Sequence, residues 1–167
     1  MRMEPHLAAA LAEISTGIYV LTVREGERLH GMSSSWVTQV SGDPPLLMAA
    51  VDKRHFSHGF IERQGVFGLN VVGQKGKALE DYFYSAASRR PDNLEPFAYE
   101  FGETGIPLLK LAMAVLECRV VASYPAGDHT LFVATVVRAE VREQDRAVTS
   151  LDLPYVYVGT VISRRRN

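Results

Sequence analysis

One stretch of small, hydroxyl-bearing residues stands out among the segments that could bind a ligand. Residues 31–46 read GMSSSWVTQVSGDPPL. Small side chains leave backbone N–H and C=O groups open, so a flat ring with polar edges can approach closely and hydrogen bond to them. The alternative interpretation is a serine-rich edge strand followed by a turn. The candidate ring contacts in this segment are Ser33, Ser34, Ser35, Trp36, Gln39 and Ser41.

A cluster of positive charge follows one expected strand later. Residues 51–61 read VDKRHFSHGFI, in which Lys53, Arg54 and His58 supply positive charge. Ser57 is placed to cap a helix, and the N-terminus of a helix offers unpaired N–H groups to an anion. This pattern suits a phosphate group. The alternative is a solvated, charged turn that precedes a capped helix.

His129 is a third candidate, in the segment GDHTLFV of residues 127–133. It lies where a loop enters an expected strand. There it could reach a ligand over the mouth of a barrel, or it could be an ordinary residue of a surface hairpin. Because it is separate in sequence from the two segments above, we expect it to act at a different step.

Several familiar motifs for nucleotide binding, zinc binding and dithiol chemistry are missing from the sequence. There is no G-x-G-x-x-G, no G-x-x-x-x-G-K-[ST], no H-E-x-x-H and no C-x-x-C. Asp52, His55 and His58 are close enough in sequence to share a metal ion. Imidazoles beside a helix start more often hydrogen bond or contact an anion, so we expect no metal site.

The composition is that of a globular protein. Its 167 residues predict one domain over 1–167, with residues 1–9 and 162–167 peripheral. A net charge of -1 gives no reason to expect nucleic acid or an acidic membrane surface as a partner. The longest apolar run, residues 44–51, is far shorter than the ~20 residues of a membrane span. The N-terminus lacks the cationic start of a secretory signal, so we expect a cytoplasmic protein. Cys118 is the sole cysteine, which excludes an internal disulfide, and we expect it to be buried.

The remaining pattern predicts many strands and few helices. We expect short helices over residues 5–13, 55–63 and 75–84, and strands over residues 17–24, 29–40, 46–51, 66–72, 113–121, 131–142 and 155–161. Residues 85–105 are expected to form a long loop of functional importance. Alternation in the strand over 131–142 places one set of residues on a single face, namely Leu131, Val133, Thr135, Val137, Ala139 and Val141. Six or more such strands predict a closed antiparallel barrel, which leaves no exposed sheet edge.

Taken together, these segments resemble the flavin reductase-like family of FMN-binding split barrels. The matching pieces run in order through residues 10–160, and this order makes the match specific. They are STGIYVLT at 15–22, GMSSSW at 31–36, VSGDPP at 40–45, Lys53 with Ser57 and His58, GVFGLNV at 65–71, TGIPL at 104–108 and GDHTLFV at 127–133. The variant MSSSWVTQVS is similar to flavoredoxin and to flavin reductase-like modules within larger electron-transfer flavoproteins.

The resemblance implies a mainly β fold, a six-stranded antiparallel Greek-key split barrel with a few peripheral helices. It implies a homodimer with a flavin near each subunit interface. The flavin would be FMN, with FAD as the alternative. Residues 33–41 would contact the isoalloxazine and ribityl chain, residues 53–58 would meet the phosphate, and His129 would lie near the nicotinamide.

The expected activity is that of an NAD(P)H-dependent flavin oxidoreductase, whose electron acceptor is a monooxygenase or another redox protein. Two alternatives remain open. One is a flavin-binding electron carrier without a nicotinamide site, and the other is a non-redox module for a planar ligand. Trp36 is bulkier than the residue usual in the family, which leaves open whether the flavin exchanges as a substrate or stays bound as a prosthetic group.

Overall fold

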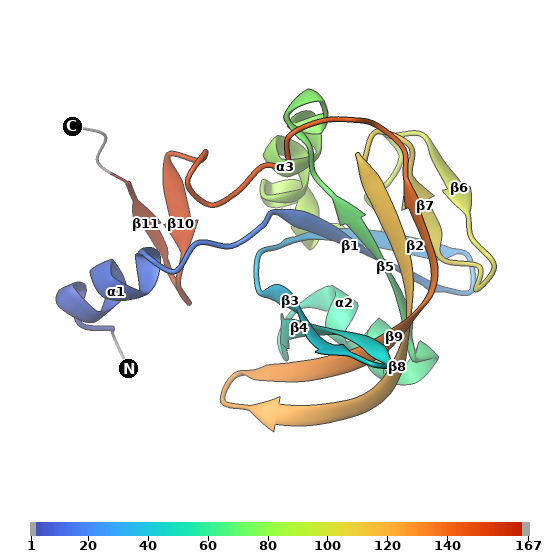
Figure 1. The fold of residues 1–167 in the computed structure, drawn as a ribbon, viewed down its shortest axis with the longest axis horizontal. Coiled ribbons are helices and arrows are strands. Elements are labelled where there is room, and N and C mark those ends of the chain that lie inside the picture. Colours follow the sequence, from blue (N-terminus) through green and yellow to red (C-terminus); the bar gives the residue numbers. More distant parts are fainter. Residues whose placement is uncertain (1–2, 165–167) are drawn as a thin grey trace.

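The chain folds mainly into β-strands joined by short helices (Figure 1). The computed structural model describes residues 3–164. The helices are α1 (Pro5–Ala12), α2 (Phe56–Gln64), α3 (Ala78–Phe83) and two 3₁₀ turns, η1 (Gln74–Gly76) and η2 (Ala86–Arg89). The strands are β1 (Tyr19–Glu25), β2 (Arg28–Ser34), β3 (Val37–Gly42), β4 (Pro45–Asp52), β5 (Val66–Val71), β6 (Tyr99–Phe101), β7 (Pro107–Leu109), β8 (Ala114–Ala126), β9 (His129–Val141), β10 (Tyr155–Tyr157) and β11 (Val161–Ser163).

Seven strands form one antiparallel sheet in the order β2-β1-β5-β8-β9-β4-β3. The two edge strands, β2 and β3, are consecutive along the chain, and Ser35 and Trp36 alone connect them. From Ser34 to Val37 an extended chain spans at most about 11 Å, so the two edges must come together at Trp36. The sheet therefore curls into a barrel that is split along the seam between β2 and β3.

This architecture confirms the expected class, mainly β and antiparallel with few helices. The sheet has seven strands rather than six because the segment expected as one strand over residues 29–40 is divided into β2 and β3. The helix expected over residues 75–84 is shorter, and η1 precedes it. The expected loop over residues 85–105 contains η2 and β6.

The long β8–β9 hairpin bridges the two halves of the sheet. The first half of β8 pairs with β5, whereas the first half of β9 pairs with β4. Two irregularities in the β8–β9 register, at Glu117/Cys118 and at Val120/Ala122, flank the place where these regions meet, at Arg119 and Thr135. Bulges of this kind bend a strand and increase its twist, which lets the sheet turn from one half of the barrel to the other.

Strand β1 buries side chains on both of its faces. Val20 belongs to a core that β1 shares with α3 and the segment of β7, whereas Leu21 and Val23 face the barrel interior. The interior core also contains Phe67 and Phe132, and α2 closes it with Phe60. Cys118 is buried there, as expected, and burial raises the pKa of its thiol to about 12.

The expected burial of β9 needs a correction. Phe132 and Ala134 are the fully buried apolar residues of this strand, and they lie on the face opposite to the apolar set that alternation marks from Leu131 to Val141. Residues 131–134 are apolar on both faces, so period-two alternation alone did not indicate which face points inward. The other face stays partly open to solvent, with Val137 40% and Val141 79% exposed.

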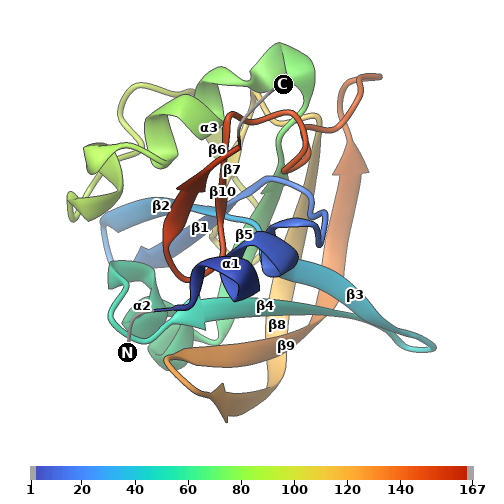
Figure 2. The same ribbon diagram turned by 90° about the vertical axis from the view of Figure 1, so that its left-hand side faces the viewer.

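The two ends of the described chain meet in an arm, defined here as α1 with the β10–β11 hairpin. In Figure 1 the arm stands on one side of the barrel, and Figure 2 shows α1 and β10 in front of it. The arm has a small core of its own, in which Ala8 and Ala12 pack against Val156 and Val158. The expected single strand over residues 155–161 is this separate hairpin and does not join the main sheet.

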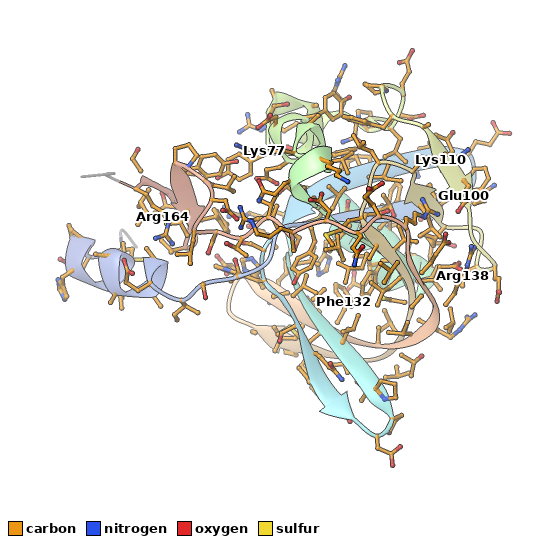
Figure 3. The ribbon with its side chains drawn as sticks, turned by 45° about the horizontal axis from the view of Figure 1, so that its top comes forward. Lys77, Glu100, Lys110, Phe132, Arg138 and Arg164 are labelled. Atoms are coloured by element: carbon orange, nitrogen blue, oxygen red, sulfur yellow. The ribbon has the colours of Figure 1, made fainter. Side chains whose placement is uncertain are left out.

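Arg164 belongs to the arm, on the far side of the molecule from Glu100 and Arg138 (Figure 3). Its Nη2 atom donates to the backbone oxygen of Ala12 at 2.5 Å. The three consecutive arginines at residues 164–166 predict a solvated terminus, and this prediction is wrong for Arg164. The other two arginines of that tail lie outside the described residues. Within residues 3–164, no helix is both long and apolar enough to cross a membrane.

Candidate functional site

Two neighbouring pockets lie at the seam of the barrel. The inner pocket has a volume of about 270 Å³, and the arm, the end of β2 and helix α3 contribute to its walls. The outer pocket has a volume of about 530 Å³ and lies between the start of α2 and η2. Asp52, His55 and Ser88 line both pockets, so the two spaces adjoin.

The serine segment lines the inner pocket because it crosses the seam. Ser33 and Ser34 end β2, and Ser35 and Trp36 carry the chain to β3. The Trp36 carbonyl accepts a hydrogen bond from the Ala50 backbone N–H at 2.9 Å, which holds this connection against β4. The structure thus brings together four of the predicted ring-contacting residues. Gln39 and Ser41 do not line the pocket; the Gln39 Nε2 group donates to the backbone oxygen of Ser41 on the exposed part of β3.

A buried carboxylate in the same pocket was not predicted from the sequence. Glu80 of α3 is 1% exposed and accepts hydrogen bonds from the Ser33 hydroxyl at 2.6 Å and from the Tyr155 hydroxyl at 2.8 Å. Burial raises the pKa of Glu80, and the two hydroxyl donors partly oppose that rise. The signal in the sequence was its position on the helix face shared with Phe83 and Tyr84, three and four residues later.

Aromatic side chains form most of the remaining wall. Tyr84 stacks on Tyr155 with 4.4 Å between ring centroids and an interplanar angle of 17°. The Tyr84 hydroxyl is buried without a hydrogen-bond partner among the described residues, and burial raises the pKa of that phenol to about 12. Across the pocket, the Trp36 ring lies 5.3 Å from the Tyr157 ring. Flat aromatic walls and an unsatisfied buried hydroxyl fit a planar ligand with polar edges.

His129 also lines the inner pocket. It begins β9, is 6% exposed, and its ring lies 4.8 Å from the Trp36 ring. Its Nδ1 atom is 2.6 Å from a carboxylate oxygen of Asp128. The carboxylate can accept only, so Nδ1 carries the proton and Nε2 is left to accept in the neutral imidazole. This hydrogen bond also holds the pKa of Asp128 below its usual range.

The predicted phosphate cluster is divided by the fold. Lys53 donates from Nζ to the Gly127 oxygen at 2.8 Å, and its backbone N–H donates to the Asp128 oxygen. Lys53 therefore fixes the loop that carries His129. Arg54 lines the outer pocket and forms an ion pair with Asp52, which lowers the pKa of that carboxyl to about 2.

Ser57 and His58 line neither pocket. The Ser57 hydroxyl is fully buried and lies 2.6 Å from Nδ1 of His30, whereas His58 Nε2 lies 2.8 Å from the Thr130 hydroxyl. The side chain that caps α2 is His55, not Ser57 as expected, since His55 Nδ1 accepts from the Ser57 backbone N–H. Among residues 3–164 there is no group of three histidine, cysteine or acidic side chains placed to hold a metal ion.

The outer pocket is lined by two arginines, by the carboxylate of Asp52 and by neutral polar groups. Arg54 and Arg89 line it, together with the N-terminus of α2. Burial, with a smaller contribution from nearby His30, lowers the pKa of His55 to about 4. Its imidazole is therefore uncharged near pH 7, where it can cap the helix by accepting a hydrogen bond.

The low pKa of His55 predicts a loss of stability in mild acid. The unfolded chain binds a proton at His55 below its ordinary pKa of 6.5, whereas the folded chain does so only near pH 4. Stability from this group is thus fully present above pH 6.5 and falls as the pH drops toward 4, by about 3 kcal/mol in total at most. Urea titrations at several pH values measure this slope. The variant His55→Asn keeps a capping side chain but has no imidazole to protonate. The slope of its unfolding free energy against pH between pH 4 and 6.5 should fall by the amount that one proton contributes. An unchanged slope would contradict the assignment to His55.

The fold is a split antiparallel barrel, and the pocket at its seam is lined by aromatic rings and hydroxyl groups. Together they define a class of binding protein suited to a planar ligand with polar edges. Residues 11–163 match the family profile described as flavin reductase like domain. The NADH-dependent flavin reductase of a Rhodococcus species is 36% identical over 134 residues, which cover 78% of this chain and 73% of that protein. The 4-hydroxyphenylacetate 3-monooxygenase reductase component of Thermus thermophilus is 32% identical over 142 residues, covering 85% and 88%.

A solved structure agrees with these relatives. The NADH:FAD oxidoreductase SgcE6 of Streptomyces globisporus has a TM-score of 0.79 to this chain at 28% identity, covering 89% of this chain and 91% of that one. SgcE6 is also known in complex with NAD and FAD fragments. The chain belongs to the flavin reductase-like family. The expected class of activity, NAD(P)H-dependent flavin reduction, is confirmed at the level of this family.

Proposed function

We propose that this protein binds a flavin in the inner pocket and reduces it with hydride from a nicotinamide nucleotide. The observation that carries the proposal is the inner pocket itself, with aromatic walls, a rim of serine hydroxyls and His129 beside Trp36. The isoalloxazine would supply the redox chemistry, accepting hydride from the reduced nicotinamide. The protein supplies binding, orientation and the exclusion of water.

The serine residues would hold the ring edge. The Ser33 hydroxyl donates a hydrogen bond to Glu80, so the Ser33 oxygen can still accept one from a ligand N–H. Ser34 and Ser35 add further polar groups, and Trp36 gives a flat surface. The Tyr84 hydroxyl, which has no partner among the described residues, is available to a polar atom of the ligand.

The phosphate would lie in the outer pocket. Arg54 and Arg89 can form charge-assisted hydrogen bonds to phosphate oxygens there. We propose FMN as the flavin because one phosphate fits this arrangement. The volume of the outer pocket also leaves room for the adenylate of FAD. Lys53, Ser57 and His58 contribute by holding the loop and the helix that border these pockets.

Reduction by a nicotinamide nucleotide under anaerobic conditions tests the activity directly. We expect the protein to bind added FMN near one per chain, with quenching of flavin fluorescence, and NADH or NADPH to bleach the flavin absorbance. A protein that binds flavin but is not bleached would be an electron carrier fed by another redox protein. A protein that binds no flavin would contradict the proposal altogether.

We also propose a homodimer that passes electrons to a monooxygenase or another redox protein in the cytoplasm, where its nicotinamide donor is made. The Thermus relative is the reductase component of such a monooxygenase. The β8–β9 hairpin carries a partly exposed apolar face, to which Val121, Tyr124, Val137 and Val141 contribute. Several exposed apolar residues along one hairpin commonly mark an interface.

Light scattering at micromolar concentration should give about twice the 18.5 kDa mass of the chain. The double variant Val121→Lys with Val137→Lys should shift the mass toward that of a monomer, since charge on the apolar face of the hairpin opposes its burial. A lysine pair at the exposed positions Glu27 and Thr38 lies off this hairpin and outside both pockets, and serves as a control. A clean monomer that carries a full complement of flavin would contradict the dimer.

A further inference from the structure

The arm is held to the barrel by few contacts, although it forms one wall of the inner pocket. Tyr155, Val156, Tyr157 and Val161 of the arm line that pocket. Among the described residues, one hydrogen bond joins the β10–β11 hairpin to the barrel and its helices, the bond from the Tyr155 hydroxyl to Oε1 of Glu80. Ring contacts add to it, namely the Tyr84–Tyr155 stack and the Trp36–Tyr157 contact, and Tyr155 also packs against the core that contains Phe83.

The carboxyl group of Glu80 also contacts strand β2, on the other side of the inner pocket from the arm. Oε2 of Glu80 accepts from the hydroxyl of Ser33 on β2, while Oε1 accepts from Tyr155 on β10. Glu80 is almost completely buried, and a buried carboxyl is costly unless hydrogen bonds satisfy it. Asp81 and Lys77 are its charged neighbours on the helix, and Tyr84 faces it from the next turn. The hydroxyls of Ser33 and Tyr155 are therefore held at a separation that this one carboxyl determines.

We propose that Glu80 is a positioning residue that sets the width of the inner pocket by joining the arm to β2. This role rests on the proposed function in one respect, which is that the inner pocket binds flavin. Glu80 acts through Ser33, whose oxygen it leaves as an acceptor, and through Tyr155, whose ring it holds against Tyr84. Its shape and hydrogen-bonding capacity matter here, and its charge does not.

The fluorescence of Trp36 reports the position of the arm in the protein without a ligand. Trp36 is the sole tryptophan of the chain, and its ring contacts Tyr157 of the arm. Release of the arm exposes Trp36 to water and shifts its fluorescence emission to longer wavelength. This measurement on the protein without flavin separates a failure of the present proposal from a failure of the proposed function, which would show as a wild-type protein that binds no flavin.

Tyr155→Phe removes the hydrogen bond and keeps the ring stack. We expect this variant to shift Trp36 emission to longer wavelength and to raise both the FMN dissociation constant and KM for flavin about tenfold, with kcat within about twofold at saturating flavin. Glu80→Ala should do the same. Glu80→Gln should restore most of the wild-type behaviour, because an amide can accept from one hydroxyl and donate to the other.

Two control variants lie on the same helix. Asp81→Asn removes an exposed charge beside Glu80, and Tyr82→Phe removes a hydroxyl that bonds with Arg90 at the surface. Neither should move the emission or the dissociation constant. If Glu80→Ala does not fold, Tyr155→Phe still decides. A Tyr155→Phe protein with wild-type emission and FMN affinity would overturn the proposal, and so would a Glu80→Gln protein as impaired as Glu80→Ala, since the charge would then be what acts.

Discussion

Replacing His129 with alanine is expected to slow the anaerobic reduction of bound flavin by NADH or NADPH about 100-fold. The imidazole lies in the inner pocket against Trp36. The hydrogen bond to Asp128 fixes its tautomer and leaves Nε2 to accept a hydrogen bond from a second ligand. Losing a group that positions one reactant over another costs this much when the reacting atoms move by about 1 Å. Stopped-flow absorbance at the flavin maximum measures the rate.

The FMN dissociation constant of His129→Ala should stay within about threefold of wild type, or roughly 0.65 kcal/mol. Asp128→Asn should give a smaller, intermediate loss of rate, because the imidazole is then free to change tautomer. His6→Ala, at an exposed position on α1, is the matched control. If His129→Ala loses FMN but reduces the remaining flavin at the normal rate, His129 belongs to the flavin site instead. If neither quantity changes, it is a residue of the surface loop.

Replacing Arg89 with alanine should weaken FMN binding at least tenfold and leave riboflavin binding unchanged. Arg89 lines the outer pocket, and a hydrogen bond to a charged group is typically worth about 1.5–3 kcal/mol. Riboflavin lacks the phosphate and does not reach this charge. Fluorescence titration with the two ligands in parallel gives both dissociation constants.

Two variants separate phosphate binding from general damage. Arg90→Ala removes the adjacent exposed arginine, which bonds with Tyr82 and does not line the outer pocket, so both affinities should be unchanged. Lys53→Ala frees the Gly127 oxygen and should weaken both ligands alike, by a small factor, through the loop that carries His129. An Arg89→Ala protein that loses riboflavin as strongly as FMN would place the phosphate elsewhere, and a Lys53→Ala protein that discriminates between them would return it to Lys53.

The fold could be predicted from the sequence where the pattern was local. Alternation and turn residues located most strands within a few positions, and Gly26 forms the turn between β1 and β2 with a φ of 62°. The division of residues 29–40 into two edge strands was not predictable in this way, because it depends on where distant strands pair. The same holds for β9, where residues apolar on both faces left the choice of inner face to the packing of Phe132.

The site was predicted in part for the same reason. The segment over residues 33–36 and His129 reach one pocket, although nearly a hundred positions separate them. The cluster over residues 53–58 is continuous in sequence, but strand and helix geometry point its members in different directions, and only Arg54 of the predicted four lines a pocket. Glu80, Tyr84 and Tyr155 escaped prediction because an isolated glutamate or tyrosine resembles many surface residues until burial shows otherwise.

The arm also has a consequence for how the protein matures. Helix α1 is made about 140 residues before the hairpin that it packs against. At about 5–20 residues per second, α1 waits roughly 7–30 s for its partner. The barrel strands can pair during that interval, but the wall formed by Tyr155 and Tyr157 cannot exist until those residues have been made. Ligand loading therefore follows the synthesis of the β10–β11 hairpin, and a nascent chain stalled before residue 155 should fold much of its sheet and yet retain no ligand.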